Sequence, residues 1–274
     1  MSPRRQHIPW KAAGSASEAE HSADAVVRET GWVFNNRGDH ISLAEFVATG
    51  DDETLAYLQA FGLNGPHRPD QSMVEIGSGI GRMTASFTRL FAKVVACDLD
   101  AAFLERCRET VAQFGKPDHL QTSHVADGRT LALPDDSADL VFSYITLQHC
   151  HRDDALGLAR ESVRVARPGG HVALNFRTWV AGDVVLWPAG KVMRATWRLP
   201  RVGRVIAQRR FAARLGWQAN RLTPTQVMAA LGDTVTEVSV FRSPKRRSFA
   251  VPRTTDGVFE GVHRSHWWLV ATVK

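Results

Sequence analysis

The sequence has few residues that could cross-link the chain or anchor it in a membrane. Its 274 residues include three cysteines, Cys97, Cys107 and Cys150, which show no paired spacing. Such a content excludes a disulfide framework, offers too few ligands for a zinc site and is typical of a reducing compartment. No apolar run reaches the ~18 residues that a membrane-spanning helix needs. We therefore expect a cytoplasmic protein.

The N-terminal segment also lacks a continuous apolar run. Residues 1–25 are polar and contain no apolar core of the kind that a signal peptide carries. This composition predicts a disordered tail. We expect a helical entry segment over residues 26–70 and a single large domain over residues 71–274, a length that one α/β domain can fill.

Acidic residues are absent from one long segment. From Val184 to Gly232 the chain has nine Lys or Arg and no Asp or Glu, within an overall net charge of +6. Apolar residues recur there at helical spacing, with Lys191, Arg194 and Arg198 on another face until Pro200. A second helical pattern follows over residues 202–215.

The most informative segment is an apolar run that ends in closely spaced glycines. Residues 74–84 read V-E-I-G-S-G-I-G-R-M-T, which predicts a buried strand, a glycine turn and a helix that opens at about Gly81. Gly77 permits a tight turn, and Gly79 and Gly81 let backbone N–H groups approach a ligand. The spacing G-x-G-x-G differs from the G-x-G-x-x-G of dinucleotide folds, since Arg82 takes the sixth position.

Further strands follow this turn at regular distances, and two of them end in an acid. Residues 93–98 are an apolar run that ends in Asp98, and residues 123–127 are a strand-like run that ends in Asp127. Residues 138–144 read A-D-L-V-F-S-Y as a fourth strand. The sequence R-P-G-G at 167–170 then turns the chain into a fifth strand over residues 171–176.

In this order the segments resemble the class I S-adenosylmethionine (SAM) dependent methyltransferases. The resemblance is to the small-molecule type, whose domain families are numbered methyltransferase 11 and 25. The resemblance covers about residues 72–176 and implies an α/β fold, a doubly wound seven-stranded sheet of order 3-2-1-4-5-7-6 with strand 7 antiparallel. Residues 234–241 and 266–273 would be strands 6 and 7. The basic insertion after strand 5, residues 178–222, would form a helical lid.

The resemblance also assigns the cofactor, SAM, and its site. It implies that the glycine turn lines the methionine part, that Asp98 holds the ribose, and that Asp127 accepts from the adenine amino group. The expected SAM-binding residues are Glu75, Gly77, Gly79, Gly81, Asp98, Leu99, Asp127, Gly128, Ser143 and Tyr144. Structural alternatives stay open: Asp98 as a helix N-cap, Asp127 as a turn residue and Glu75 as a solvated strand end.

The catalytic candidate lies just after the fourth strand. A hydroxyl acceptor needs a general base or a metal, and an imidazole titrates near neutrality. His149 is therefore our candidate for the base, with packing or helix capping as its alternative. Cys150 is more typical of a half-buried thiol than of a nucleophile. No carboxylate-paired metal site is evident, so we expect no metal.

These observations predict a methyltransferase that acts on a small-molecule, glycoside or lipid-linked acceptor, with oxygen as the favoured atom. The alternatives are an RNA methyltransferase, supported only by the basic lid, and a SAM-fold binding subunit without turnover. For residues 184–221 three interpretations stay open: peripheral contact with an anionic membrane at its inner face, binding of an anionic acceptor, or a solvated lid. Nucleic acid is not the expected partner, and the oligomeric state is left open.

Overall fold

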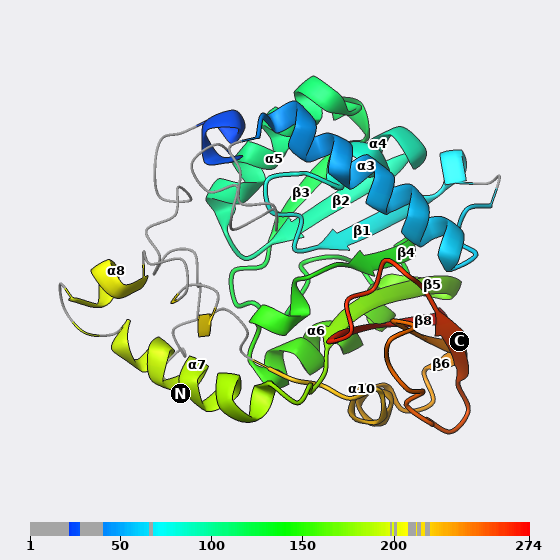
Figure 1. Cartoon of the computed structure of the whole chain (residues 1–274). Coiled ribbons are helices and arrows are strands. Elements are labelled where there is room, and N and C mark those ends of the chain that lie inside the picture. The colour runs from blue at the N-terminus through cyan, green and yellow to red at the C-terminus, as the bar shows by residue number, and fades with distance from the viewer. Residues whose placement is uncertain are drawn as a thin grey trace.

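The fold is built on one eight-stranded sheet with helices on both faces (Figure 1). The computed structural model describes residues 22–27, 41–65, 68–197, 199, 202–207, 212, 215–216 and 220–274. The strand order is β3-β2-β1-β4-β5-β8-β6-β7. Pairings among the first five strands are parallel, whereas β8 is antiparallel to both β5 and β6.

The predicted doubly wound order is therefore confirmed, with one additional strand. The strands are β1 (Ser72–Ile76), β2 (Lys93–Asp98), β3 (Leu120–His124), β4 (Ala138–Ser143), β5 (Ala166–Arg177), β6 (Val235–Arg242), β7 (Thr255–Val258) and β8 (His266–Val273). The extra strand is β7, a short edge strand parallel to β6. Its residues, T-D-G-V, are mostly exposed. The sequence there has no apolar run that would predict a strand.

Helices connect the strands and cover the sheet. They are α3 (Leu43–Ala60), α4 (Thr84–Leu90), α5 (Ala101–Phe114), α6 (Arg152–Val165), α7 (Asp183–Thr196), α8 (Val202–Ala207) and α10 (Pro224–Leu231), with short 3-10 turns η1 (Arg68–Asp70), η2 (Pro117–His119) and η3 (Leu147–His149). Helices α3, α4 and α5 lie on one face of the sheet, and α6 and α10 lie on the other (Figure 1). None of the helices in the described ranges has the length and apolar character needed to cross a bilayer.

Successive strand residues point to opposite faces and so divide the core in two. Met73 packs with the aromatic residues of α3 and α4, while Val74 packs toward α6 and α10. The two adjacent tryptophans of β8 show the same alternation, since Trp267 belongs to the α6 and α10 side and Trp268 to the other. Both indoles are fully buried, so they pack within the core.

The R-P-G-G segment does not lie outside the fifth strand as predicted. Strand β5 begins at Ala166, so residues 167–170 form its first part. The expected turn is present as an irregularity: Gly169 has φ of 76°, and the pairing register with β4 shifts between Ala138 and Leu140. A glycine at this φ keeps the strand paired on both sides of the irregularity.

The predicted N-terminal boundary is wrong at its last residues. Residues 23–27 are helical, and Ala23 is buried against α3 and α5, so the part of the tail from 23 to 25 is ordered. Residues 1–21 lie outside the described residues, as do 28–40 of the entry segment. The predictions for Arg198, Pro200 and most of residues 208–219 also concern positions outside the described residues.

Candidate functional site

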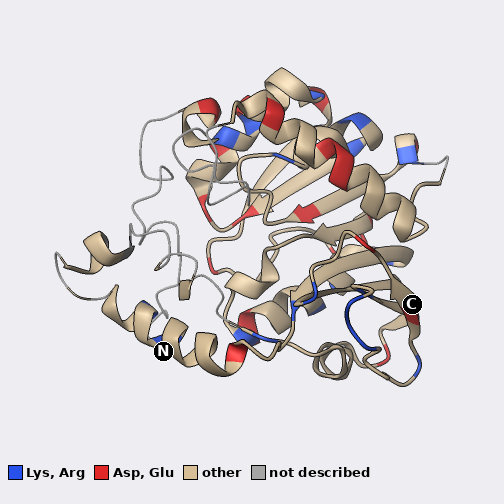
Figure 2. Cartoon of the chain, viewed as in Figure 1, with Lys and Arg blue, Asp and Glu red and all other residues tan. Residues whose placement is uncertain are grey.

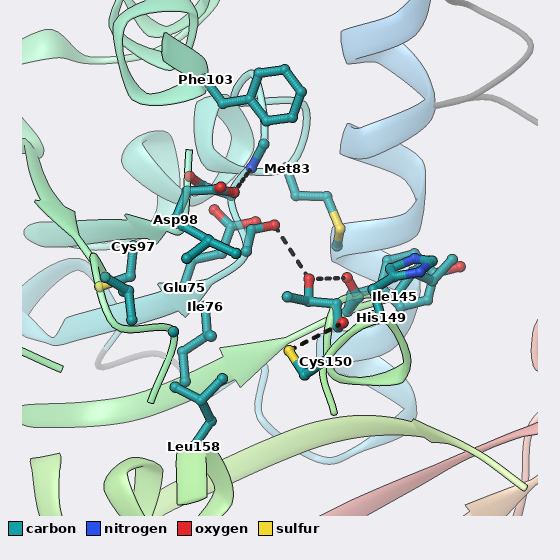
Figure 3. Close-up of a pocket in the computed structure, with 18 of the residues that line it drawn as sticks. Glu75, Ile76, Met83, Cys97, Asp98, Phe103, Ile145, His149, Cys150 and Leu158 are labelled. Atoms are coloured by element: carbon teal, nitrogen blue, oxygen red, sulfur yellow. Dashed lines mark hydrogen bonds between the residues drawn. The ribbon is translucent and has the colours of Figure 1, made fainter. Parts of the chain in front are cut away.

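A cavity of about 220 Å³ opens at the carboxyl ends of β1, β2 and β4. In a parallel sheet this edge is where the strand order reverses and where ligands bind. Its lining includes Phe46, Glu75, Gly77, Gly79, Arg82, Met83, Asp98, Leu99, Val125, Gly128, Tyr144, Thr146, His149 and Cys150. Glu75 and Asp98 lie on one side in Figure 3, and His149 lies across from them.

The glycine turn after β1 shapes the floor of this cavity. Gly77 has φ of 81°, and a Cβ there would come within 2.0 Å of the Oγ1 atom of Thr146. The loop after β4 can therefore approach the turn only because residue 77 is glycine. Gly79 has φ of 54°, and a Cβ there would meet nothing within 4 Å, so it would project into open space beside the cavity.

Two N–H groups of the turn, those of Gly79 and Gly81, form hydrogen bonds within the protein, and the approach of backbone N–H groups to a ligand stays a prediction. The N–H of Gly79 donates to Oδ2 of Asp98 at 2.9 Å, and the N–H of Gly81 donates to the carbonyl of Ser78 at 3.0 Å. Gly81 does not line the cavity; a Cβ there would stand 3.1 Å from Cys107 of α5. Helix α4 begins at Thr84 rather than at about Gly81. The glycines thus provide close packing and space for a ligand, while the N–H groups of Gly79 and Gly81 bond within the protein.

Asp98 ends β2 with its carboxylate at the cavity. Its Oδ1 accepts from the N–H of Asp100 at 2.9 Å, opposite the bond to Gly79. Burial raises the pKa of Asp98 to about 6, against the lowering effect of these two hydrogen bonds. The helix-cap alternative does not hold, because Asp100 is the N-cap of α5 and accepts from the N–H of Ala102.

Glu75 is also buried at the cavity, so it is not a solvated strand end. Its Oε2 accepts from the hydroxyl of Thr84 at 2.6 Å. Burial raises the pKa of Glu75 to about 7, while the Thr84 hydrogen bond and the charge of Arg82 lower it. The site therefore holds two carboxylates that are costly to ionise without a partner.

The loop after β3 brings one of its two candidate residues to the cavity. Gly128 lines it, as does Leu99 from the loop after β2. Asp127 is exposed, and its Oδ1 accepts from the N–H groups of Arg129 and Thr130, both at 2.9 Å. Burial raises its pKa, but these backbone donors outweigh it and the pKa is lowered. This is the turn geometry that the sequence left open; the adenine role of Asp127 stays a prediction.

Of the two cofactor-binding residues predicted at the end of β4, Ser143 and Tyr144, the second lines the cavity. Tyr144 lines the cavity and stacks on Trp268, with ring centroids 5.4 Å apart and an interplanar angle of 9°. Burial raises the pKa of Tyr144 to about 12, so its hydroxyl stays protonated. Ser143 is fully buried and donates from Oγ to the carbonyl of Ile76 at 3.0 Å. It joins β4 to β1 and does not reach the cavity.

His149 lies at the cavity, at the end of the short η3 turn. Its Nε2 is 3.3 Å from Nε2 of Gln148, and its own N–H donates to the carbonyl of Thr146. Asn220, which follows the basic segment in the chain, holds this turn in place. Its Nδ2 donates to the carbonyls of Leu147 and Cys150 at 2.6 and 2.8 Å. The turn that carries His149 is thus held in place, and its imidazole lies at the cavity across from Glu75 and Asp98 (Figure 3).

Cys150 is unsuited to a nucleophilic role. Burial raises the pKa of its thiol to about 12, so no thiolate forms near neutrality. Within the described ranges no group of three or more His, Cys, Asp or Glu side chains is placed to hold a metal ion.

The main residue that sequence reasoning missed is Arg82. Its Nη2 donates to Oε2 of Glu53 at 2.7 Å and its Nη1 to Oγ1 of Thr49 at 3.3 Å, both on α3. The guanidinium lies over the rings of Phe46 and Tyr144, at 5.7 and 6.0 Å from their centroids. The entry helix thereby places a cation at the cavity beside Glu75. The signal in the sequence is Arg82 together with residues 46–50, F-V-A-T-G, which only the fold brings close to it.

The charges and shape of this site fit SAM. The cofactor carries an ammonium, a carboxylate and a ribose diol, and the cavity offers the carboxylates of Glu75 and Asp98 and the guanidinium of Arg82 as counterparts. The missing Cβ of Gly79 leaves room beside them. Each buried carboxylate would gain a hydrogen-bond donor from such a ligand.

Comparisons with known proteins agree with this interpretation. A family model described as a methyltransferase domain matches residues 74–174. A carboxy-S-adenosyl-L-methionine synthase of Pseudomonas putida is 31% identical over 121 residues, which are 42% of this chain and 49% of that protein. A demethylmenaquinone methyltransferase of Corynebacterium kroppenstedtii is 29% identical over 66% of this chain and 72% of its own length. The chain spans about half the length of the first of these relatives.

Solved structures support the fold. Phosphoethanolamine N-methyltransferase 1 of Haemonchus contortus superposes with a TM-score of 0.53 at 14% identity, covering 97% of this chain and 48% of that one. Together, the ordered motifs, the strand order and the family match show a methyltransferase domain over residues 74–174, with the fold of the class I SAM-dependent methyltransferases and S-adenosyl-L-methionine as its cofactor.

Proposed function

We propose that this protein transfers a methyl group from SAM to a hydroxyl oxygen of a small-molecule, glycoside or lipid-linked acceptor. The observation that carries the proposal is the layout of the cavity, with two buried carboxylates and a guanidinium on one side and an imidazole on the other. The relatives' names describe different reactions, so the acceptor is argued from the residues of this chain.

The carboxylate side accounts for cofactor binding. Asp98 would accept hydrogen bonds from the ribose hydroxyls, since each of its oxygens has a lone pair beyond those used by Gly79 and Asp100. Glu75 would accept from the ammonium and Arg82 would donate to the carboxylate of the methionine part. When bound, SAM supplies a methyl group already activated by its sulfonium.

The imidazole side accounts for the acceptor. A hydroxyl is a weak nucleophile until its proton is removed, and His149 is a titratable side chain at this side of the cavity, which His151 and Asp154 also line. It would take the proton from the acceptor oxygen as the new carbon–oxygen bond forms. Tyr144, Met83 and Phe46 line the cavity with apolar surface that excludes water and so limits hydrolysis.

Incubation of the purified protein with methyl-labelled SAM and fractionated cell extract tests the proposal. We expect the label to enter one fraction, in a product in which a free hydroxyl has become resistant to acetylation. Label in an amine or at carbon would refute the oxygen assignment. Tight binding of SAM with no transfer to any fraction would instead favour the binding-subunit alternative.

A further inference from the structure

Helix α7 turns its apolar residues away from the protein. The side chains of Val184, Val185 and Val192 are 74%, 70% and 66% exposed. With Pro188, which is also exposed, they follow the spacing of one helix face. Figure 1 shows α7 and α8 projecting from the sheet at the side of the molecule.

The inward side of α7 is polar. Asp183, fully buried, pairs through Oδ1 with Nη2 of Arg177 at 2.8 Å and Nη2 of Arg221 at 2.9 Å. Arg194 is half-buried and donates to the carbonyl of Gly216 at 3.2 Å. The helical spacing predicts Lys191, Arg194 and Arg198 together on a face apart from the apolar one, but Arg194 lies on the inward side. The helix thus reverses the usual amphipathic pattern of a soluble protein.

Exposed apolar residues are concentrated in this part of the chain. Seven of the ten large hydrophobic residues that are exposed among the described residues lie between 184 and 205. We call them the lid surface: Val184, Val185, Leu186, Val192, Leu199, Val202 and Val205. Exposed apolar residues that gather in one segment in this way indicate an interaction site, whereas residues scattered singly do not.

The charge of the same segment indicates what covers the lid surface. Residues 184–232 carry nine cations and no acid. Most of α7 is free of charge of either sign in Figure 2, and the ammonium of Lys191 lies 3.4 Å from the ring centroid of Trp187. Trp187 pairs with the half-exposed Trp179 at 5.5 Å. Apolar residues flanked by tryptophan and cations are typical of a helix that lies at a membrane interface.

A second copy of the chain fits this surface less well. Two lid surfaces in contact would bring together two segments that both carry an excess of cations. An anionic lipid surface provides the opposite charge and an apolar layer below it. At 14 residues α7 is too short to span a bilayer, so it would lie along the surface.

We propose that the lid surface docks on an anionic membrane, with α7 in the plane of the interface. The valines enter the acyl boundary, and the positive charge of the segment draws it to the anionic headgroups. The cavity belongs to the same chain, so docking brings it to the membrane, where a lipid-linked molecule is accessible. This inference does not depend on which atom accepts the methyl group.

Co-sedimentation of the full chain with vesicles tests the proposal. Vesicles of phosphatidylcholine alone are compared with vesicles that also contain phosphatidylglycerol, at low and high salt. The variant replaces Val184, Val185 and Val192 together by serine. The matched control is Val258→Ser, since Val258 is 53% exposed but lies on the edge strand β7.

We expect the wild type and Val258→Ser to pellet with the anionic vesicles, less so at high salt. The triple variant should partition at least about tenfold less, because each inserted valine contributes about that factor. An unbound wild type, or equal pelleting of the triple variant, would overturn the proposal. So would a dimer in sedimentation velocity that only the triple variant loses, because the surface would then join two copies. Calorimetric titration with SAM on the same samples shows whether the cavity is intact, so a failure here stays separate from a failure of the proposed function.

Discussion

Replacement of Asp98 by asparagine probes the cofactor side of the cavity. The variant keeps the size of the side chain but removes its charge and one acceptor oxygen. In the wild type Oδ2 accepts from Gly79 and Oδ1 from Asp100, each at 2.9 Å. In the variant one of these N–H groups, or one ribose hydroxyl, must face an amide NH₂.

The expected loss can be worked from these contacts. A hydrogen bond to a charged acceptor contributes about 1.5–3 kcal/mol, so binding of S-adenosylhomocysteine should weaken about 10- to 100-fold. The pH dependence should change as well. The pKa of Asp98 is raised to about 6, and a hydroxyl donor favours the ionised form. The wild-type affinity should therefore rise as pH increases through about 6, and Asp98→Asn should lose this part of the rise while it keeps the part that Glu75 gives near 7.

Isothermal titration calorimetry from acid to neutral pH measures both effects. Asp100→Asn is the matched control, because asparagine caps a helix about as well as aspartate and Asp100 does not line the cavity. It should bind like the wild type. If Asp98→Asn binds as tightly as the wild type with an unchanged pH profile, the assignment of Asp98 to the cofactor is refuted.

Three further predictions concern the neighbouring residues. The pKa of Glu75 is raised from 4.5 to about 7, so its contribution to the stability of the free protein is present below about 4.5 and lost as pH rises through 7. Glu75→Gln should therefore be more stable than the wild type by about 3 kcal/mol at pH 8 and equal to it near pH 4. Urea unfolding that shows no such difference would contradict the burial argument. His149→Asn should lower kcat about 100-fold or more while the affinity for SAM stays within about threefold, and equal losses of both would remove His149 from the base role. Gly77→Ala should lower the free energy of unfolding by about 2 kcal/mol or more in thermal unfolding, because its Cβ meets Thr146. Gly62→Ala is the control and should lower it less, since Gly62 has φ of 69° and a Cβ there would meet nothing within 4 Å. Equal losses would mean that the approach of Thr146 to Gly77 is not tight.

The order of the sheet could be predicted because its strands are short apolar runs separated by helices, and this pattern leaves few topologies. Strand β7 could not, since residues 255–258 read T-D-G-V and are held only by pairing with β6. The cavity followed from the same order, because parallel strands bring Asp98 and the glycine turn to one edge.

The roles of individual side chains were harder to predict. The periodicity of the sequence shows that α7 has an apolar face, but it does not show which face of the helix is buried. The buried ion pairs of Asp183 with Arg177 and Arg221 show that the face of Asp183 is the buried one. Arg82 likewise depends on Glu53, which lies 29 residues away in the sequence. Ser143 and Gly81 match the family pattern by position, yet they serve strand pairing and helix packing.

The account depends on the cavity between Glu75, Asp98 and His149 being the place where this chain holds SAM. Equilibrium dialysis of the purified protein against labelled SAM measures this directly. We predict saturable uptake of one molecule per chain, displaced by S-adenosylhomocysteine and reduced in Asp98→Asn. Absence of saturable uptake by the folded wild-type protein would contradict the account.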